Sequence, residues 1–339
     1  MNQVTSHLPV AITMGCPVGV GPEIILKFFA SGHHSAEEQV VVIGDSKVLH
    51  WCARELRLDA EIVAWQPGQD IVAGTIPVLA PDHGLDPATL YWGRPDKRTG
   101  RAMALYIETA VRLLQNGVLA AMTTCPIAKS SLQAAGYNYP GHTEMLADLC
   151  QSREYGMMMT GDRLRVTLVT IHVGLAQVPR LLTRESVAGM IMATDRTLRR
   201  DFAISEPKIA VAGLNPHAGE DGLFGDEEIK VIAPAINTAA MRGCHVHGPF
   251  PPDTVFFKAA AGEYDAVVCM YHDQGLIPFK LLHFSDGVNV TFGLPIVRTS
   301  VDHGTAYDIA GKGVADPSSL QAAVHLANRI AVNREMIPC

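Results

Sequence analysis

Short runs of β-branched and apolar residues alternate along this chain with segments whose apolar residues recur at helical spacing. Six runs are predicted strands, at residues 9–14, 39–43, 120–123, 165–171, 208–214 and 266–270. Helical spacing spans 100–115 and 183–199, and a C-terminal helix is expected at 318–333. Strands that alternate with helices form a mostly parallel sheet covered on both faces. The predicted fold class is therefore α/β.

Three histidines follow predicted strands of this pattern. His172, His217 and His272 stand where the strands that begin near residues 165, 208 and 266 run out. A single histidine in such a place is more often a packed or capping residue than a ligand. In open α/β sheets, however, ligands bind at the carboxyl ends of the strands, and imidazole is a common ligand of transition metals. Three such histidines favour a shared catalytic metal site, and three nitrogens favour zinc, cobalt, nickel or iron over magnesium.

Composition excludes several classes of function. A net charge of −7 argues against a nucleic-acid binder, and no basic run or long apolar stretch indicates a membrane partner. Residues 1–10 show no signal peptide. The seven cysteines are scattered and form no C-x-x-C pair, so we expect a reduced, cytoplasmic protein.

Two glycine-rich loops lie near the ends of the chain. The loop 13–23 follows a predicted strand and opens a helix, with Pro22 and Glu23 suited to its first turn. It is neither a G-x-G-x-x-G nor a phosphate-binding P-loop sequence, so a tight turn and a ligand loop are equally good interpretations. The loop 302–316 leads into the C-terminal helix, and its His-Gly-Thr start favours a ligand loop over a mere connection.

Other polar residues have two interpretations each. His142 or Thr143 could simply cap the helix expected at 144–150. Asp253 follows two prolines, which is typical of a turn, but its carboxylate could also assist a metal or a proton transfer. Solvated charge is the usual state of a lysine or arginine. A polar group in apolar sequence needs a partner, and an anionic substrate is one candidate for Lys280, Asn289 and Arg298.

Taken together, these stretches resemble the 4-hydroxythreonine-4-phosphate dehydrogenase family of pyridoxal-phosphate (pyridoxine) biosynthesis. The resemblance covers essentially the whole chain, through residues 13–23, 140–144, 213–225, 248–254, 270–278 and 287–313. The two end loops also resemble the isopropylmalate and isocitrate dehydrogenases, which oxidise a hydroxyl with a nicotinamide cofactor and then release CO₂. Cys16 departs from the family, where an acidic residue is common at this position.

The resemblance implies a fold and an assembly. It implies two α/β/α domains with mostly parallel sheets, similar to isopropylmalate dehydrogenase, with the active-site cleft between them. The predicted domains are 1–136 plus 305–339, and 137–304 with the metal ligands and the dimer contacts. The interruptions of the pattern at 136–142 and 295–304 are compatible with two interdomain crossings. A homodimer with the site at the subunit interface is expected from the same source.

The resemblance also assigns roles to residues. One divalent metal per site, either zinc, cobalt or magnesium, would be bound by His172, His217 and His272. The small phosphorylated hydroxy amino acid substrate would be bound by His142, Thr143, Lys280, Asn289 and Arg298. The cofactor, NAD in preference to NADP, would lie against His303, Gly304 and Thr305. Asp253 and a metal-bound water are the candidates for the general base.

The function implied is that of an NAD-dependent and metal-dependent oxidoreductase. It would oxidise 4-phosphohydroxy-L-threonine at C3 to 2-amino-3-oxo-4-phosphooxybutanoate, which loses CO₂ to give 3-amino-2-oxopropyl phosphate. A D-threonate or D-erythronate 4-phosphate dehydrogenase of the same superfamily is the nearest alternative. From other classes, a zinc-dependent hydrolase would suit three histidines, and a non-catalytic metal-binding or phosphate-binding protein remains open.

Overall fold

The computed structural model describes residues 8–32, 39–82 and 84–336 of the chain. The expectation that residues 1–10 hold no signal peptide concerns a segment of which residues 1–7 lie outside the described residues. The chain forms two compact units, one from residues 1–153 and 294–335 and the other built on 154–293. Among the described residues, no helix is long and apolar enough to cross a membrane.

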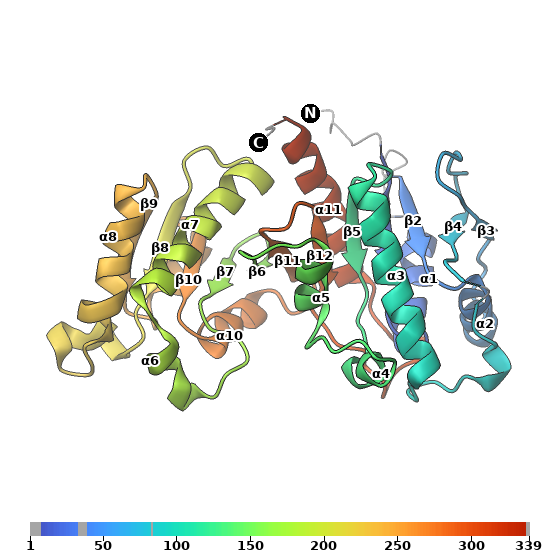
Figure 1. The fold of residues 1–339 in the computed structure, drawn as a ribbon, viewed down its shortest axis with the longest axis horizontal. Helices are drawn as coiled ribbons and strands as arrows, with labels where there is room; N and C mark the ends of the chain where they lie inside the picture. Colours follow the sequence, from blue (N-terminus) through green and yellow to red (C-terminus); the bar gives the residue numbers. More distant parts are fainter. Residues whose placement is uncertain (1–7, 33–38, 83, 337–339) are drawn as a thin grey trace. The chain divides into compact units, whose positions relative to one another are not determined.

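Unit 1 contains a parallel sheet in the order β3-β4-β2-β1-β5-β12 (Figure 1). Its strands are β1 Val10–Thr13, β2 Val40–Ile43, β3 Ile62–Ala64, β4 Ile76–Leu79, β5 Ala121–Thr124 and β12 Arg298–Val301. Its helices are α1 Gly21–Ala30, α2 Ser46–Leu56, α3 Lys97–Gln115, α4 Lys129–Ala134, α5 His142–Leu149 and α11 Ser318–Met336, with a short 3₁₀ turn η1 Pro87–Thr89. In Figure 1, α3 lies in front of this sheet, with α1 and α11 behind it.

Unit 2 contains a mixed sheet in the order β11-β6-β7-β10-β8-β9, in which β6 runs antiparallel to both of its neighbours. Its strands are β6 Gly156–Thr160, β7 Arg165–Leu168, β8 Lys208–Ala212, β9 His245–Phe250, β10 Ala266–Cys269 and β11 Val288–Phe292. Its helices are α6 Val178–Leu181, α7 Arg184–Asp201, α8 Ala233–Met241, α9 Val255–Ala260 and α10 His272–Leu282, with the short turns η2 Leu175–Gln177, η3 Pro216–Gly222 and η4 Glu228–Ile232.

The predicted α/β class is confirmed, and each of the six predicted strands is present within two or three residues of its expected bounds. Burial explains why these six could be read from the sequence. Nearly every residue of β1, β2, β5 and β10 is buried, because parallel strands are covered on both faces and are therefore continuously apolar. Among the strands that were not predicted, β3 and β9 are more exposed, and β4, although buried, contains a proline, which is unusual inside a strand.

Two helix starts show how local sequence sets the boundaries. Thr183 caps α7 as expected, because its hydroxyl accepts from the Ser186 backbone while the Ser186 hydroxyl accepts from the Thr183 backbone. The expectation that His142 or Thr143 caps the next helix is wrong. Helix α5 begins at His142 itself, with Gly141 as N-cap and no side-chain capping bond.

The boundaries of the units differ from the predicted ones. The prediction placed residues 137–153 and 294–304 in the second domain, whereas both segments belong to unit 1. The reason is local pairing: β12 joins the parallel sheet of unit 1 through β5, with Arg298 opposite Met122, and α5 contacts α3. His142, Thr143 and Arg298 therefore lie in a different unit from the three histidines of the predicted metal site.

Candidate active site

Two of the three predicted metal ligands lie side by side in unit 2. Strands β7, β10 and β8 are parallel neighbours, so the segments that follow them leave the same edge of the sheet. His172 follows β7 and His272 begins α10, and their ring centroids are 5.8 Å apart. Both line a cavity of about 270 Å³, together with Ile171, Val173, Leu175, Val178, Tyr271 and Asp273. The Asp273 carboxylate lies 2.7 Å from Nδ1 of His272, which fixes the orientation of that imidazole.

His217 follows β8 at the same sheet edge, and its ring lies 6.2 Å from that of Phe224. The five residues 217–221 all have positive φ angles, an unusual run in which only one residue is glycine. Among the described residues, no three His, Cys, Asp or Glu side chains are grouped so that they could hold a metal ion. The donor set therefore fits a divalent metal in part, through two adjacent imidazoles.

Two buried residues fix the loops that carry these histidines. The Glu228 carboxylate, 3% exposed, accepts hydrogen bonds from the backbones of Leu214 and Asn215 at 2.7 and 2.8 Å. Gln274 joins two strand ends, since its side chain accepts from the Met270 backbone and donates to the Gly213 carbonyl, both at 2.6 Å. Neither residue was predicted from the sequence, although Gln274 lies in the segment 270–278 that contributes to the family resemblance.

The other predicted residues of unit 2 lie in different settings. Asp253 is exposed in the turn between β9 and α9. Lys280 is half-buried on α10, and its ammonium lies 6.0 Å from the Phe284 ring centroid. Asn289 of β11 donates to the Met157 sulfur at 3.3 Å, while its buried Oδ1 has no hydrogen-bond partner among the described residues. The structure thus places an unsatisfied amide oxygen on the β11 strand of the sheet.

Unit 1 contains a buried cation at the start of β12. Arg298 is 2% exposed, and its Nε and Nη2 both donate to Oγ1 of Thr124 at 3.2 and 2.7 Å. Burial lowers the pKa of this guanidinium to about 9, partly offset by the nearby carboxylate of Glu144. The group therefore remains charged at neutral pH. A buried guanidinium can bind an anionic ligand through charge-assisted hydrogen bonds.

The positive charge of Arg298 acts on the His142 imidazole. Its Nε2 is buried and has no hydrogen-bond partner among the described residues. Burial, reinforced by the positive charges of Arg298 and Lys129, lowers the pKa of the His142 imidazole well below its usual value. A neutral imidazole can donate a hydrogen bond to an anion without adding charge. Thr143, the next residue of α5, is half-buried. Lys129, whose charge acts on His142, was not among the site residues predicted from the sequence.

The two glycine-rich loops pack against each other in unit 1. The Val20 backbone donates to the Thr305 carbonyl at 3.1 Å, and the Tyr307 hydroxyl lies 3.6 Å from the Cys16 sulfur. His303 is exposed and contacts the Gly304 carbonyl through Nδ1 at 3.0 Å. A Cβ atom added to Gly304 would meet nothing within 4 Å, so this stretch of backbone is open to a ligand.

Helix α1 anchors the second loop through one ion pair. Glu23, which is fully buried, lies 3.0 Å from Nζ of Lys27. Its carboxylate also accepts from the backbones of Gly313 and Ala315 at 3.2 and 2.7 Å. Lys27 donates to the carbonyls of the same two residues. Glu23 thus accepts from the backbone N–H groups of the segment 313–315, and Lys27 donates to its carbonyls, so the two side chains together clamp this segment.

Comparison with known proteins gives the relationships of the chain. The family described as "Pyridoxal phosphate biosynthetic protein PdxA" matches residues 36–327. A protein of Desulforapulum autotrophicum named 4-hydroxythreonine-4-phosphate dehydrogenase is 51% identical over 327 residues, which is 96% of each chain. A D-threonate 4-phosphate dehydrogenase of Pectobacterium atrosepticum is 43% identical and covers 95% of this chain and 99% of that one.

A solved structure supports the same relationship. The crystal structure of 4-hydroxythreonine-4-phosphate dehydrogenase from Klebsiella pneumoniae matches with a TM-score of 0.88 at 44% identity, and it covers 98% of this chain and 99% of that chain. The fold and these relatives together define an α/β dehydrogenase, that is, an oxidoreductase. The chain belongs to the pyridoxal phosphate biosynthetic protein PdxA family. The resemblance read from the sequence is thereby confirmed, and the hydrolase and non-catalytic alternatives are set aside.

We expect Glu23→Ala to lower the free energy of unfolding by about 2–3 kcal/mol. The substitution leaves two backbone donors and Lys27 without their buried acceptor. Urea unfolding measures the change. Glu55→Ala, at an exposed position of α2 in the same unit, serves as the control and should change stability by less than about 0.5 kcal/mol. Equal values for the two variants would contradict the clamp.

The depressed pKa of His142 predicts a pH effect on stability. Above its ordinary pKa of 6.5 the imidazole is neutral in both the folded and unfolded states. Below that pH the imidazole is protonated in the unfolded chain but stays neutral in the folded chain. The free energy of unfolding therefore decreases as the pH falls. In phosphate-free buffer, the wild type should lose about 1 kcal/mol more than His142→Gln over the first pH unit below 6.5. Parallel pH profiles of urea unfolding for the two proteins would show that the imidazole is not depressed.

Proposed function

We propose that the chain is a 4-hydroxythreonine-4-phosphate dehydrogenase. It would oxidise 4-phosphohydroxy-L-threonine at C3 with NAD to 2-amino-3-oxo-4-phosphooxybutanoate, which then loses CO₂ to give 3-amino-2-oxopropyl phosphate. The choice of substrate is supported by the 51% identity, over 96% of each chain, to the Desulforapulum protein of that name. The 43% identity to the Pectobacterium enzyme keeps D-threonate 4-phosphate as the second candidate.

The phosphate of the substrate is proposed to bind in unit 1, at the cluster formed by Arg298, His142 and Thr143. Arg298 supplies a buried guanidinium that is charged at neutral pH and donates to Thr124. His142 supplies a neutral imidazole, and Thr143 adds a hydroxyl at the start of α5. Lys280 and Asn289 of unit 2 are proposed as further substrate-binding residues, and the support for Asn289 is its buried oxygen without a partner among the described residues. Gripping the phosphate supplies binding energy that positions C3 for reaction.

A divalent metal is proposed to bind through His172 and His272, with His217 as the third ligand. The support is the adjacency of the first two rings and the common sheet edge of all three segments. Zinc, cobalt and magnesium are the candidates. When bound, such an ion lowers the pKa of a coordinated hydroxyl and stabilises negative charge on oxygen. Asp273 orients the His272 ring for this role.

The remaining steps are assigned to the chain as proposals. A bound nicotinamide cofactor would accept the C3 hydride, and Asp253 is proposed as the general base that accepts the proton of the C3 hydroxyl. Its support is position: β9 runs parallel to β8, so Asp253 follows β9 at the same sheet edge as the histidines. His303, Gly304 and Thr305 are proposed to line the cofactor site, where the open backbone at Gly304 allows close approach.

The test is NADH formation by the metal-loaded protein with each of two substrates, 4-phosphohydroxy-L-threonine and D-threonate 4-phosphate. We expect turnover with the first. His172→Asn and His272→Asn should each lose about 100-fold or more in kcat/KM and should also bind less metal when metal content is measured. His245→Asn, an exposed histidine of β9, is the control and should keep both.

Either of two results would contradict this function. Turnover only with D-threonate 4-phosphate would show that the enzyme is a D-threonate 4-phosphate dehydrogenase, the second candidate. Full activity and full metal content in both histidine variants would remove the metal site from this edge of the sheet.

A homodimer is also proposed, and helix α10 is the surface that supports it. Ile277 and Leu281 lie one turn apart on α10, Phe284 follows two residues after its end, and these side chains are 68%, 84% and 81% exposed. Large apolar side chains exposed near one another are typical of an interface. The helix begins at His272 and carries Lys280, so a second copy on this face would border the candidate site.

We expect Leu281→Asp to convert the dimer into a monomer, because it would bury a charge in the contact. Sedimentation at several concentrations measures the mass. Val314→Asp, an exposed apolar residue of unit 1, is the matched control and should leave the mass unchanged. A monomeric wild type, or a dimer that Leu281→Asp leaves intact, would contradict this surface.

A further inference from the structure

Lys129 is a cation of unit 1 that has no role in the sites described so far. It is the first residue of helix α4, which follows β5 through residues 125–128. Its side chain is exposed, and its ammonium has no ion pair or hydrogen bond among the described residues. A solvated charge is the ordinary state of such a lysine. The surroundings of Lys129, however, indicate a more specific role.

The Lys129 side chain lies at the start of helix α5. A Cβ atom added to Gly141, the N-cap of α5, would lie 3.7 Å from Cε of Lys129. The charge of Lys129 also acts on the imidazole of His142, the first residue of α5, and helps to lower its pKa. Because Arg298 lowers the pKa of the same imidazole, both cations lie near His142. Lys129 therefore borders the cluster of Arg298, His142 and Thr143.

Helix α5 offers backbone donors at this place. Its N-cap is Gly141, and no side chain caps the helix start. The first backbone N–H groups of a helix have no partner within the helix, and the aligned peptide dipoles make this end favourable for an anion. The buried Nε2 of His142, which has no hydrogen-bond partner among the described residues, independently indicates a polar ligand here.

The net charge of this cluster depends on Lys129. Arg298 contributes one positive charge, but the carboxylate of Glu144, in the first turn of α5, acts on that guanidinium. One cation and one nearby anion leave the cluster close to neutral. A phosphate monoester carries about two negative charges at neutral pH, so its binding favours a further cation. Lys129 can supply this charge, because its flexible four-carbon stem begins next to the helix start.

We propose that Lys129 is a further phosphate-binding residue, and that its charge makes the cluster select dianionic phosphate monoesters over monoanionic ligands. The identity of the bound group rests on the proposed function, which puts the substrate phosphate at Arg298 and His142. The Lys129 ammonium would pair with one phosphate oxygen, while the guanidinium of Arg298 and the start of α5 bind the others.

Selectivity between ligands of different charge reveals this role better than affinity alone. Coulomb energy is proportional to charge, so removal of the Lys129 ammonium costs a bound dianion twice the free energy that it costs a bound monoanion. A lysine that only keeps the helix start folded would affect both ligands by the same factor. The ratio of the two affinities therefore separates a charge contact with phosphate from a structural effect.

The test compares methyl phosphate, a dianion at about pH 8, with methyl sulfate, a monoanion of similar size. Phosphorus NMR titration of the purified protein measures the first ligand, and displacement of the first ligand measures the second. We expect Lys129→Gln to weaken methyl phosphate about tenfold and methyl sulfate about threefold, so that the preference for phosphate falls about threefold. Lys129→Arg keeps the charge and should retain the wild-type preference within about twofold.

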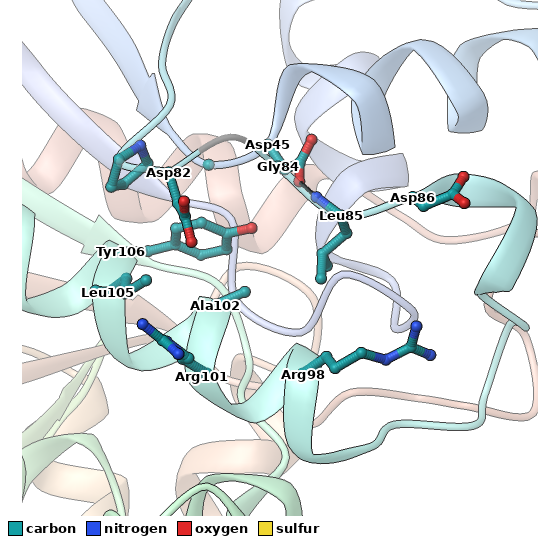
Figure 2. Close-up of a pocket in the computed structure, with 12 residues that line it drawn as sticks. Asp45, Asp82, Gly84, Leu85, Asp86, Arg98, Arg101, Ala102, Leu105 and Tyr106 are labelled. Carbon is teal, nitrogen blue, oxygen red and sulfur yellow. Dashed lines mark hydrogen bonds between the residues drawn. The ribbon is translucent and has the colours of Figure 1, made fainter.

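Arg101→Gln is the matched control. Arg101 is an exposed cation of α3 in the same unit, and it lines the cavity of about 320 Å³ shown in Figure 2. Its charge is not among those that lower the pKa of His142. Because solvent and salt screen such a charge, its removal should leave both affinities within about twofold of the wild type. Thermal unfolding of each variant shows that the fold is retained.

Unchanged affinities in Lys129→Gln, or equal losses for the two ligands, overturn the role of Lys129. If His142→Gln weakens methyl phosphate while Lys129→Gln does not, the phosphate site of the proposed function stands and this inference alone fails. Absence of methyl phosphate binding by the wild type overturns both. Because no turnover is measured, failure of the proposed dehydrogenase reaction leaves the result for Lys129 unaffected.

Discussion

Parallel pairing of strands is the constraint on which the candidate site depends. When β7, β10 and β8 run side by side in one direction, the segments after them leave one edge of the sheet. Residues separated by about a hundred positions, such as His172 and His272, are brought within 5.8 Å by this pairing. The same rule in unit 1 places the loops after β1 and β12 in contact. Chemistry in this protein is therefore assembled by the direction of strands and not by sequence proximity.

Hydrogen bonds and ion pairs to backbone hold these strand-end loops in place. Glu228 and Gln274 fix the ends of β8 and β10, Glu23 and Lys27 clamp the segment 313–315, and Asp45 ties the end of β2 to Leu85. Each of these side chains is buried or largely buried and offers several acceptors or donors to peptide groups. Loops at a ligand edge cannot be held by sheet hydrogen bonds, so buried polar side chains replace them. Such residues keep a site open without entering its chemistry.

The electrostatics of unit 1 separate two kinds of polar group. Arg298 is buried but remains a cation, while His142 beside it is driven to the neutral form by burial and by the same positive charge. Arg298 thus offers a charged donor and His142 a neutral one, and both can hydrogen-bond to a phosphate. Burial, with the nearby carboxylates of Asp45 and Asp82, raises the pKa of Tyr106 on α3 and keeps its phenol protonated. Environment, not residue type, decides what each group can offer a ligand.

The sequence by itself determined the α/β class, the strands that are buried on both faces, the Thr183 helix start and the family. These follow from local periodicity, capping and several ordered motifs, all of which act over short stretches of chain. Only the tertiary structure decided which residues meet. It placed His142 and Arg298 in unit 1, brought the His172 and His272 rings to 5.8 Å from each other, and buried Glu23 and Glu228 in roles that no local pattern marks. The physical reason is that strand order and loop conformation depend on long-range pairing, which periodicity does not encode.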